Sequence, residues 1–232
     1  MPRAVADIVA DALISTGLES VDPLFGGTDE TAREIVVALN DTAREIAEAH
    51  DWRAITRTHT ILGDGTSNII SLPTDYVRMP QGARIWSTRL GGSYSPVTDL
   101  DTWLGLDTRL GSTLMNQYLI TDDQIALAPA PGIGETVRYV YVSSLTIKNG
   151  TTYKSDFSDP NDVFLLSDRV LQLGLVYNLR KEQGLEAEHE GRKYMDALQR
   201  AISRDKGPRI ITQASSYGFE DVPMAYPGTI TG

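Results

Sequence analysis

The chain has 232 residues, of which 41% are hydrophobic and 22% are charged, values typical of an ordered globular protein and not of a disordered or collagen-like chain. Thirty-one acidic residues against 21 basic ones give a formal net charge of −10, which disfavours broad non-specific binding to nucleic acids or anionic lipids. The sequence contains no cysteine, which excludes disulfide bonds, thiolate nucleophiles and cysteine-type zinc sites.

Two amphipathic helices are predicted near the N-terminus. Apolar residues recur on one helical face over residues 5–13, and Gly17 stands where a left-handed helix end is expected. A second helix is predicted over residues 28–52, with Thr28 as its N-cap and acidic residues in its first turn.

The N-terminal part of the chain carries most of the negative charge. Residues 1–52 hold 3 basic and 11 acidic residues, a net charge of 3 − 11 = −8. Two of these acids, Asp7 and Asp11, interrupt the first apolar segment, and no run of 18 apolar residues occurs. We therefore expect no signal peptide and no membrane anchor, and we expect the chain to be made and kept inside the cell.

A β-rich segment is predicted between residues 55 and 157, where the hydrophobic period changes from that of a helix to that of a strand. Short runs rich in Val, Ile, Thr and Tyr are separated by turn residues, and apolar side chains alternate over residues 137–141. Two hairpins are also predicted from the turn residues between apolar runs. They join residues 55–62 to 68–72, and residues 117–120 to 124–127.

Helical periodicity returns in the C-terminal third of the chain. Asp159 is the predicted N-cap and Pro160 the predicted first residue of a helix whose side chains are apolar on every side over residues 163–177. Such a helix is typical of the buried centre of a bundle or of an assembly. Gly184 separates it from a last amphipathic helix that is expected to end at Gly207.

The predicted fold class is α+β, mainly a helical bundle with an inserted small antiparallel β region and an extended C-terminal arm. Two short N-terminal helices can hardly bury their own apolar faces, so we expect them to pack against the C-terminal helices. The predicted domains are a helical bundle of residues 1–57 and 158–206, an inserted β region of residues 58–157, and an arm of residues 207–232.

The predicted arm has no regular hydrophobic period, but it is too apolar for a solubilising tail. Its apolar side chains are separated by glycine and proline, as in a segment that folds on a partner. A strand or loop packed on its own subunit is the alternative. The large apolar residues are Ile210, Ile211, Tyr217, Phe219, Met224 and Tyr226.

Groups suited to catalysis or metal binding are few. The chain has three histidines, and a Glu-x-x-His motif occurs once, at Glu186 and His189, where di-iron bundles need two. Three acidic pairs could serve a glycosidase, but turn residues and helix-surface charges explain each more simply. They are Asp122 with Asp123, Asp99 with Asp101, and Glu186 with Glu190. No catalytic residue, metal site or cofactor is predicted.

Basic residues gather between residues 180 and 209, where acidic residues are interspersed among them. Mixed ion pairs on an exposed or intersubunit helix are the favoured interpretation, and nucleic-acid binding is the alternative. The basic residues are Arg180, Lys181, Arg192, Lys193, Arg200, Arg204, Lys206 and Arg209.

Five short patterns follow one another in a recognisable order along residues 1–206. They are residues 15–18 (STGL), 51–53 (DWR), 72–78 (LPTDYVR), the apolar helix after Asp162, and residues 194–198 (YMDAL). In this order they resemble the head-to-tail connector or adaptor proteins of tailed bacteriophages, including the tail tubular protein A group of short-tailed phages. The patterns at residues 51–52 and 72–78 are the most specific.

The resemblance implies a structural virion protein, not an enzyme, in the neck between capsid and tail. It implies a ring of about twelve copies beneath the portal protein, contacts with further tail or neck proteins, and a channel that DNA crosses without specific binding. The arm is then expected to reach along the portal, with Ile210, Ile211, Tyr217, Phe219 and Tyr226 as anchors. A stopper or tail-completion ring lower in the neck is the main alternative, and a hydrolase that uses acidic pairs in a β cleft is a weaker one.

Overall fold

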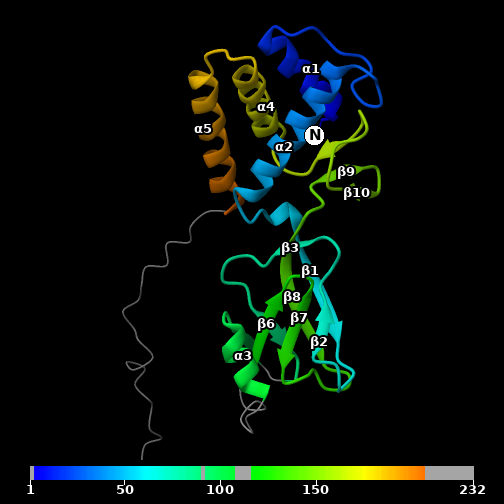
Figure 1. The fold of residues 1–232 in the computed structure, drawn as a ribbon, viewed down its shortest axis with the longest axis vertical. Coiled ribbons are helices and arrows are strands. Elements are labelled where there is room, and N and C mark those ends of the chain that lie inside the picture. Colours follow the sequence, from blue (N-terminus) through cyan, green and yellow to red (C-terminus); the bar gives the residue numbers. More distant parts are fainter. Residues whose placement is uncertain (1–2, 90–91, 108–115, 207–232) are drawn as a thin grey trace, which may run out of the picture.

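The computed structural model of the chain describes residues 3–89, 92–107 and 116–206. Four of the five α-helices of the described part gather at one end, and most strands lie with α3 at the other (Figure 1). A short 3-10 helix, η1 (Arg53–Ile55), leads from the helical end into the strands. The helices of the first end are α1 (Val5–Thr16), α2 (Glu30–Glu48), α4 (Asp168–Glu182) and α5 (Glu188–Asp205).

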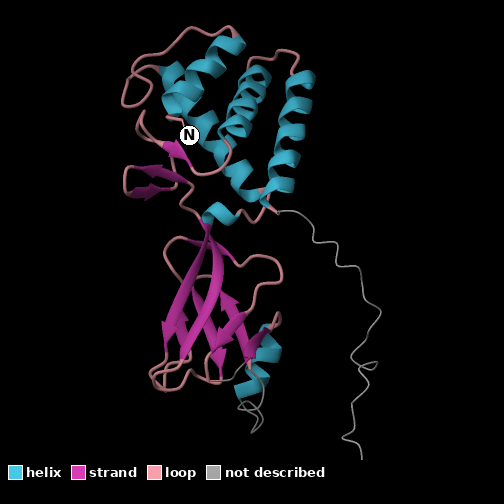
Figure 2. Ribbon diagram, turned by 180° about the vertical axis from the view of Figure 1, so that it is seen from behind, coloured by secondary structure: helices cyan, strands magenta, loops and turns pink. Residues whose placement is uncertain are grey.

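An eight-stranded mixed sheet forms the other end and curls around its own core (Figure 2). The strand order is β1-β8-β4-β5-β6-β7-β2, and β3 pairs with β8 outside this path. Neighbouring strands are antiparallel except β5 and β6, which are parallel. The elements are β1 (Thr56–Leu62), β2 (Ile69–Ser71), β3 (Tyr76–Arg78), β4 (Ile85–Ser87), β5 (Gly92–Pro96), α3 (Leu100–Asp107), β6 (Gln117–Thr121), β7 (Gln124–Ala128) and β8 (Thr136–Ser143).

A smaller three-stranded sheet lies beside the helices. Its order is β10-β9-β11, formed by β9 (Ile147–Asn149), β10 (Thr152–Lys154) and β11 (Val163–Phe164). The side chains of Ile147 and Phe164 are buried in the helical core, so this sheet belongs with the helices and not with the large sheet.

The helical core is built around α4, which packs against α1, α2 and α5. Gly174 of α4 permits this close packing, because a Cβ atom there would lie 2.6 Å from Thr42 Cγ2 of α2 and 3.0 Å from Tyr194 Cε2 of α5. Asn178 Nδ2 also donates a hydrogen bond to Thr42 Oγ1 at 2.9 Å. The buried side chains of this core include Ile8, Leu13, Ile35, Leu39, Ile46, Leu171, Leu175, Leu179 and Leu198.

The large sheet has a second, separate core. The predicted alternation over residues 137–141 is confirmed, because Val137, Tyr139 and Tyr141 of β8 all point into this core. Burial raises the pKa of the Tyr139 hydroxyl, which finds no hydrogen-bond partner among the described residues. The other buried side chains are Ile61, Ile85, Tyr94, Tyr118, Ile125 and Leu127.

Two predicted N-caps differ from those of the structure. The helix α2 is capped by Asp29, whose carboxylate accepts a hydrogen bond from the Thr31 N–H at 3.2 Å, and not by Thr28. The helix α4 begins nine residues after Asp159, with Ser167 as its N-cap, because the segment after Asp159 forms a turn and β11 instead. The left-handed end of α1 at Gly17 is confirmed, with a φ of 75°.

The predicted mainly helical bundle is wrong, although the structure is α+β. The curled eight-stranded mixed sheet dominates the architecture, with five α-helices in the described part of the chain. The expected small antiparallel region also contains a parallel pair, β5 with β6. The strands are short, and most pair with strands far away in the sequence. A local hydrophobic pattern therefore reveals single strands but not how many of them join into one sheet.

One of the two predicted hairpins is confirmed. Strands β6 and β7 pair on either side of Asp122 and Asp123. The other is wrong, because β1 pairs with β8 and β2 pairs with β7. The loop after β1 instead bonds to the loop before β8, where the Gly63 N–H donates to the Glu135 carbonyl oxygen at 2.8 Å.

Candidate interaction site

The end of α2 is joined to β3 by residues that lie far apart in the sequence. Asp51 accepts hydrogen bonds from Arg78 Nε and from the backbone N–H of Gln81, both at 3.0 Å. Arg78 also donates to the carbonyl oxygen of His50 at 3.3 Å. The two most specific sequence patterns therefore meet at the junction between the helices and the large sheet.

A second residue of the 72–78 pattern, Asp75, ties the start of β3 to β8. Its carboxylate accepts hydrogen bonds from the Ser143 hydroxyl at 2.6 Å and the Tyr141 hydroxyl at 3.0 Å, with Arg57 at 3.4 Å. Burial opposes ionisation of Asp75, but these hydrogen bonds outweigh it and hold the pKa of the carboxyl below its ordinary value. The Asp75 carboxylate therefore has a structural role, because it holds the start of β3 against β8.

The end of α5 reaches the same junction. The Arg53 backbone N–H donates to Asp205 at 3.2 Å, and the Arg53 guanidinium donates to the Lys206 carbonyl oxygen at 3.0 Å. His50 Nε2 lies 3.4 Å from Asp205. The described part of the chain thus ends at the junction. The predicted anchors Ile210, Ile211, Tyr217, Phe219 and Tyr226 lie outside the described residues.

Two buried carboxylates were not singled out by the sequence analysis. Glu135 lies at the end of the large sheet far from the helices, where it accepts hydrogen bonds from Ser87 Oγ, from Arg89 Nε at 2.6 Å and from the Gly132 N–H at 2.6 Å. Burial opposes its ionisation, but these donors hold its pKa below the ordinary value. They also fix a loop whose Ile133 side chain is 89% exposed.

Asp162 is the other buried carboxylate and is completely inaccessible to solvent. It accepts hydrogen bonds from Lys154 Nζ at 2.7 Å, Asn149 Nδ2 at 2.8 Å, and the backbone N–H groups of Ser158 at 2.9 Å and Asp159 at 3.0 Å. A carboxylate has about four acceptor sites, and these four donors occupy them, which leaves none for a substrate. Its role is to hold the segment between β9 and β11.

The predicted acidic pairs lie on separate elements. Asp122 and Asp123 are exposed in the turn between β6 and β7. Asp99 accepts a hydrogen bond from the Thr102 N–H at 2.9 Å at the start of α3, and Glu190 pairs with Arg180 at 3.0 Å. In the described residues no group of three or more acidic or histidine side chains could hold a metal ion.

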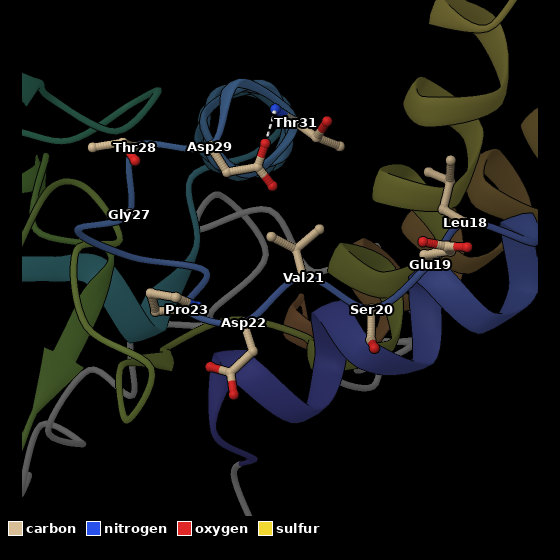
Figure 3. Close-up of a pocket in the computed structure, with 10 residues that line it drawn as sticks. All are labelled: Leu18, Glu19, Ser20, Val21, Asp22, Pro23, Gly27, Thr28, Asp29 and Thr31. Atoms are coloured by element: carbon tan, nitrogen blue, oxygen red, sulfur yellow. Dashed lines mark hydrogen bonds between the residues drawn. The ribbon is translucent and has the colours of Figure 1, made fainter.

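The loop between α1 and α2 encloses an open cavity of about 520 Å³ (Figure 3). Three carboxylates, of Glu19, Asp22 and Asp29, line it, and the Asp29 carboxylate is used to cap α2. The buried polar side-chain atoms that lack a partner within the described residues all lie outside this cavity.

The outer face of the large sheet exposes an aromatic side chain. Trp86 of β4 is 57% exposed and stands opposite Arg138 of β8. With Arg84 and Tyr139 these residues line a hollow of about 340 Å³. Tryptophan and arginine are enriched at interaction hot spots, so the exposed Trp86 and Arg138 are candidate contact residues, whereas the Tyr139 side chain is buried in the sheet core.

The basic residues of α4 and α5 fall into two sets. The predicted mixed ion pairs are present where Arg180 meets Glu190 at 3.0 Å and Arg192 meets Glu188 at 2.6 Å. Other basic residues line a groove of about 370 Å³ between the two helices. They are Arg169, Lys193, Arg200 and Arg204.

No helix in the described ranges is both long and apolar enough to cross a membrane. The family model described as SU10 adaptor protein matches residues 3–217, and the chain therefore belongs to the SU10 adaptor protein family. It is a structural adaptor of a bacteriophage and a component of the virion. A comparison with curated proteins gave no match.

Proposed function

We propose that this chain is the head-to-tail adaptor of its virion, which forms a ring beneath the portal, joins the capsid to the tail and leaves a channel for the genome. The match of the adaptor family model to residues 3–217 carries this proposal. A ring of about twelve copies and a position in the neck, as in the tail tubular protein A group, are parts of the same proposal.

The proposal includes two domains, a helical one of residues 1–57 with 158–206 and an inserted β region of residues 58–157. The two separate hydrophobic cores support two domains, but Ile147 and Phe157 of the second range are buried in the helical core, so the small three-stranded sheet would belong to the helical domain. The hydrogen bond from Arg78 to Asp51, with those from Arg78 to His50 and from Gln81 to Asp51, would hold the two domains at a fixed angle. The exposed Trp86 supports a contact of the β region with a neighbouring copy or with the next tail component.

Genome passage requires that DNA does not adhere to the channel. Twelve copies at −10 would carry a formal charge of 12 × −10 = −120. We therefore propose a channel wall that is net acidic or neutral, since a basic wall would bind phosphates and release their counterions.

The arm of residues 207–232 is proposed to dock on the portal protein. The spacing of Ile210, Ile211, Tyr217, Phe219 and Tyr226 among glycines and prolines would allow an extended chain to place single anchors in successive pockets. Several arms on one ring would act together at high effective concentration.

The test is to mix the full chain with the portal protein of the same virion and to analyse the product by size-exclusion chromatography and electron microscopy. A ring that forms on the portal is the expected result. Binding to the neck only after another protein has covered the portal would indicate a stopper. A chain that remains monomeric beside portal and cleaves a glycan would refute the proposal.

A further inference from the structure

We infer that the groove between α4 and α5 receives the acidic face of α2 from a second copy of this chain. The inference rests on the proposed function only in that both copies belong to one assembly. The inference assigns the contact between neighbouring copies to the α4–α5 groove of one and the α2 face of the other.

The groove combines an apolar floor with a basic rim. Leu173, Ala197 and Ala201 form a half-buried floor. Asp196 is the acidic residue of its lining, and its carbonyl oxygen accepts a hydrogen bond from Arg200 Nε at 3.1 Å. Within residues 3–89, 92–107 and 116–206, none of the four rim cations forms an ion pair with a carboxylate. These are Arg169, Lys193, Arg200 and Arg204.

The outward face of α2 has the opposite charge. Exposed residues follow one another at intervals of three and four along it, which places them in one stripe of the helix surface. The apolar member, Val37, is 60% exposed near the middle of the stripe. Arg33 and Arg44 border the stripe, and Arg44 is held by Asp41 at 2.9 Å and Asp156 at 2.6 Å, but the five carboxylates of the stripe outnumber these two bases. The stripe comprises Glu30, Glu34, Val37, Asp41, Glu45 and Glu48.

The charged residues of the two surfaces have the same spacing. Steps of seven and then four residues separate Lys193, Arg200 and Arg204 on α5. The same steps separate Glu34, Asp41 and Glu45 on α2. Each set spans about 16 Å at the rise of an α-helix, so parallel alignment of α2 with α5 would bring all three opposite charges together. Val37 would then lie over the apolar floor.

The two surfaces of one copy face in different directions. On α4, Gly174 and Asn178 face α2, through their contacts with Thr42. Arg169 and Leu173, which line the groove, lie about a third of a turn away on the same helix. The acidic stripe is exposed and so points away from the core that α2 shares with α4. The surfaces can therefore meet only between copies, in a head-to-tail contact that generates a ring or a filament.

Duplex DNA is the other polyanion that a basic groove could hold. The groove favours a protein occupant, because its apolar floor offers nothing to phosphates and Asp196 would repel them. The net charge of −10 on the chain also works against DNA.

The absence of cysteine allows a direct test by disulfide trapping. One chain carries Val37→Cys and a second, tagged chain carries Ala197→Cys, and the two are mixed under oxidising conditions, free and in the presence of portal. We expect a disulfide-linked heterodimer. The matched control replaces Val37→Cys by Ile14→Cys, whose position on α1 is 78% exposed, and should give only background crosslinking.

Charge reversal tests the electrostatic match. Arg200→Glu with Arg204→Glu in the tagged chain should lower the heterodimer yield about tenfold, and Asp41→Arg with Glu45→Arg in the other chain should restore it. The inference is overturned if the heterodimer yield of Val37→Cys with Ala197→Cys is no higher than that of the Ile14→Cys control, both without and with portal. It is also overturned if the yield does not change on charge reversal. If the chain binds duplex DNA and loses that binding on Arg200→Glu, the groove is a nucleic-acid site and the inferred contact between copies is wrong. If portal binding persists without the crosslink, the proposed function stands and this interface fails.

Discussion

Replacing Asp162 tests the most heavily bonded carboxylate of the described structure. Asp162→Ala removes the acceptor of Lys154 Nζ, Asn149 Nδ2 and two backbone N–H groups at a site with no solvent access. Removal of one partner of a buried ion pair costs about 3–5 kcal/mol. For a chain of this size each kcal/mol lowers the melting temperature by about 2–4 °C, so we expect a fall of roughly 6–20 °C.

The assays are thermal and urea denaturation followed by circular dichroism, with Asp122→Ala in the exposed β6–β7 turn as the matched control. The control should change the free energy of unfolding by no more than about 0.5 kcal/mol. Equal stability of the two variants would refute the bonding network around Asp162.

The pH dependence gives an independent check of the same site. Burial opposes ionisation of Asp162, but the Lys154 and backbone donors outweigh it, so its pKa in the folded state lies below the ordinary value. Its contribution is therefore complete above the unfolded pKa of about 4 and is lost as the pH falls through the folded pKa. The difference in unfolding free energy between the wild type and Asp162→Asn should shrink below about pH 4. If this difference in unfolding free energy grows on acidification instead, the pKa of Asp162 is raised and not lowered on folding, which contradicts the prediction.

Four further predictions concern packing, the junction and assembly. Gly174→Val should destabilise the chain by about 1–3 kcal/mol in urea, because its side chain would collide with α2, and wild-type stability would contradict the close approach. A double-mutant cycle of Asp51→Ala with Arg78→Ala should give a coupling energy of about 1 kcal/mol, and zero coupling would remove the proposed fastening role. Trp86→Ala should leave the melting temperature nearly unchanged but weaken assembly in sedimentation, whereas normal assembly would exclude this face from the contact. Deletion of residues 208–232 should preserve folding and weaken binding to portal, and undiminished binding would show that the arm is not the tether.

Features that depend on neighbours within one or two turns could be predicted from the sequence. The apolar face and glycine end of α1, the course of α2, the β6–β7 hairpin and the alternation along β8 all arise from local side-chain spacing and turn chemistry. The order of short patterns also pointed to the adaptor class, which the family match supports.

Local patterns failed where two structures could satisfy them equally well. Asp159 and Pro160 have the pattern of a helix start, but the buried carboxylate of the nearby Asp162 accepts hydrogen bonds from the Ser158 and Asp159 N–H groups and so closes a turn there. The runs on either side of residues 63–65 have the pattern of a hairpin, but β8 offers β1 a longer partner, paired from Thr56 to Leu62. In the first case a local turn closed by Asp162 replaced the helix start, and in the second a strand distant in sequence outweighed the local hairpin preference.

The sequence by itself determined the helical character of α1, α2 and α5, the extended character of β6, β7 and β8, the acidic character of the N-terminal part, and the absence of thiol chemistry. Only the tertiary structure decided that a mixed sheet dominates the fold, that the patterns at residues 51–53 and 72–78 meet in one junction, and that four basic residues of α4 and α5 surround an apolar groove. The physical reason is that periodicity and turn chemistry act over a few residues, whereas strand partners, buried ion pairs and surface grooves are set by contacts between segments that the chain brings together only on folding.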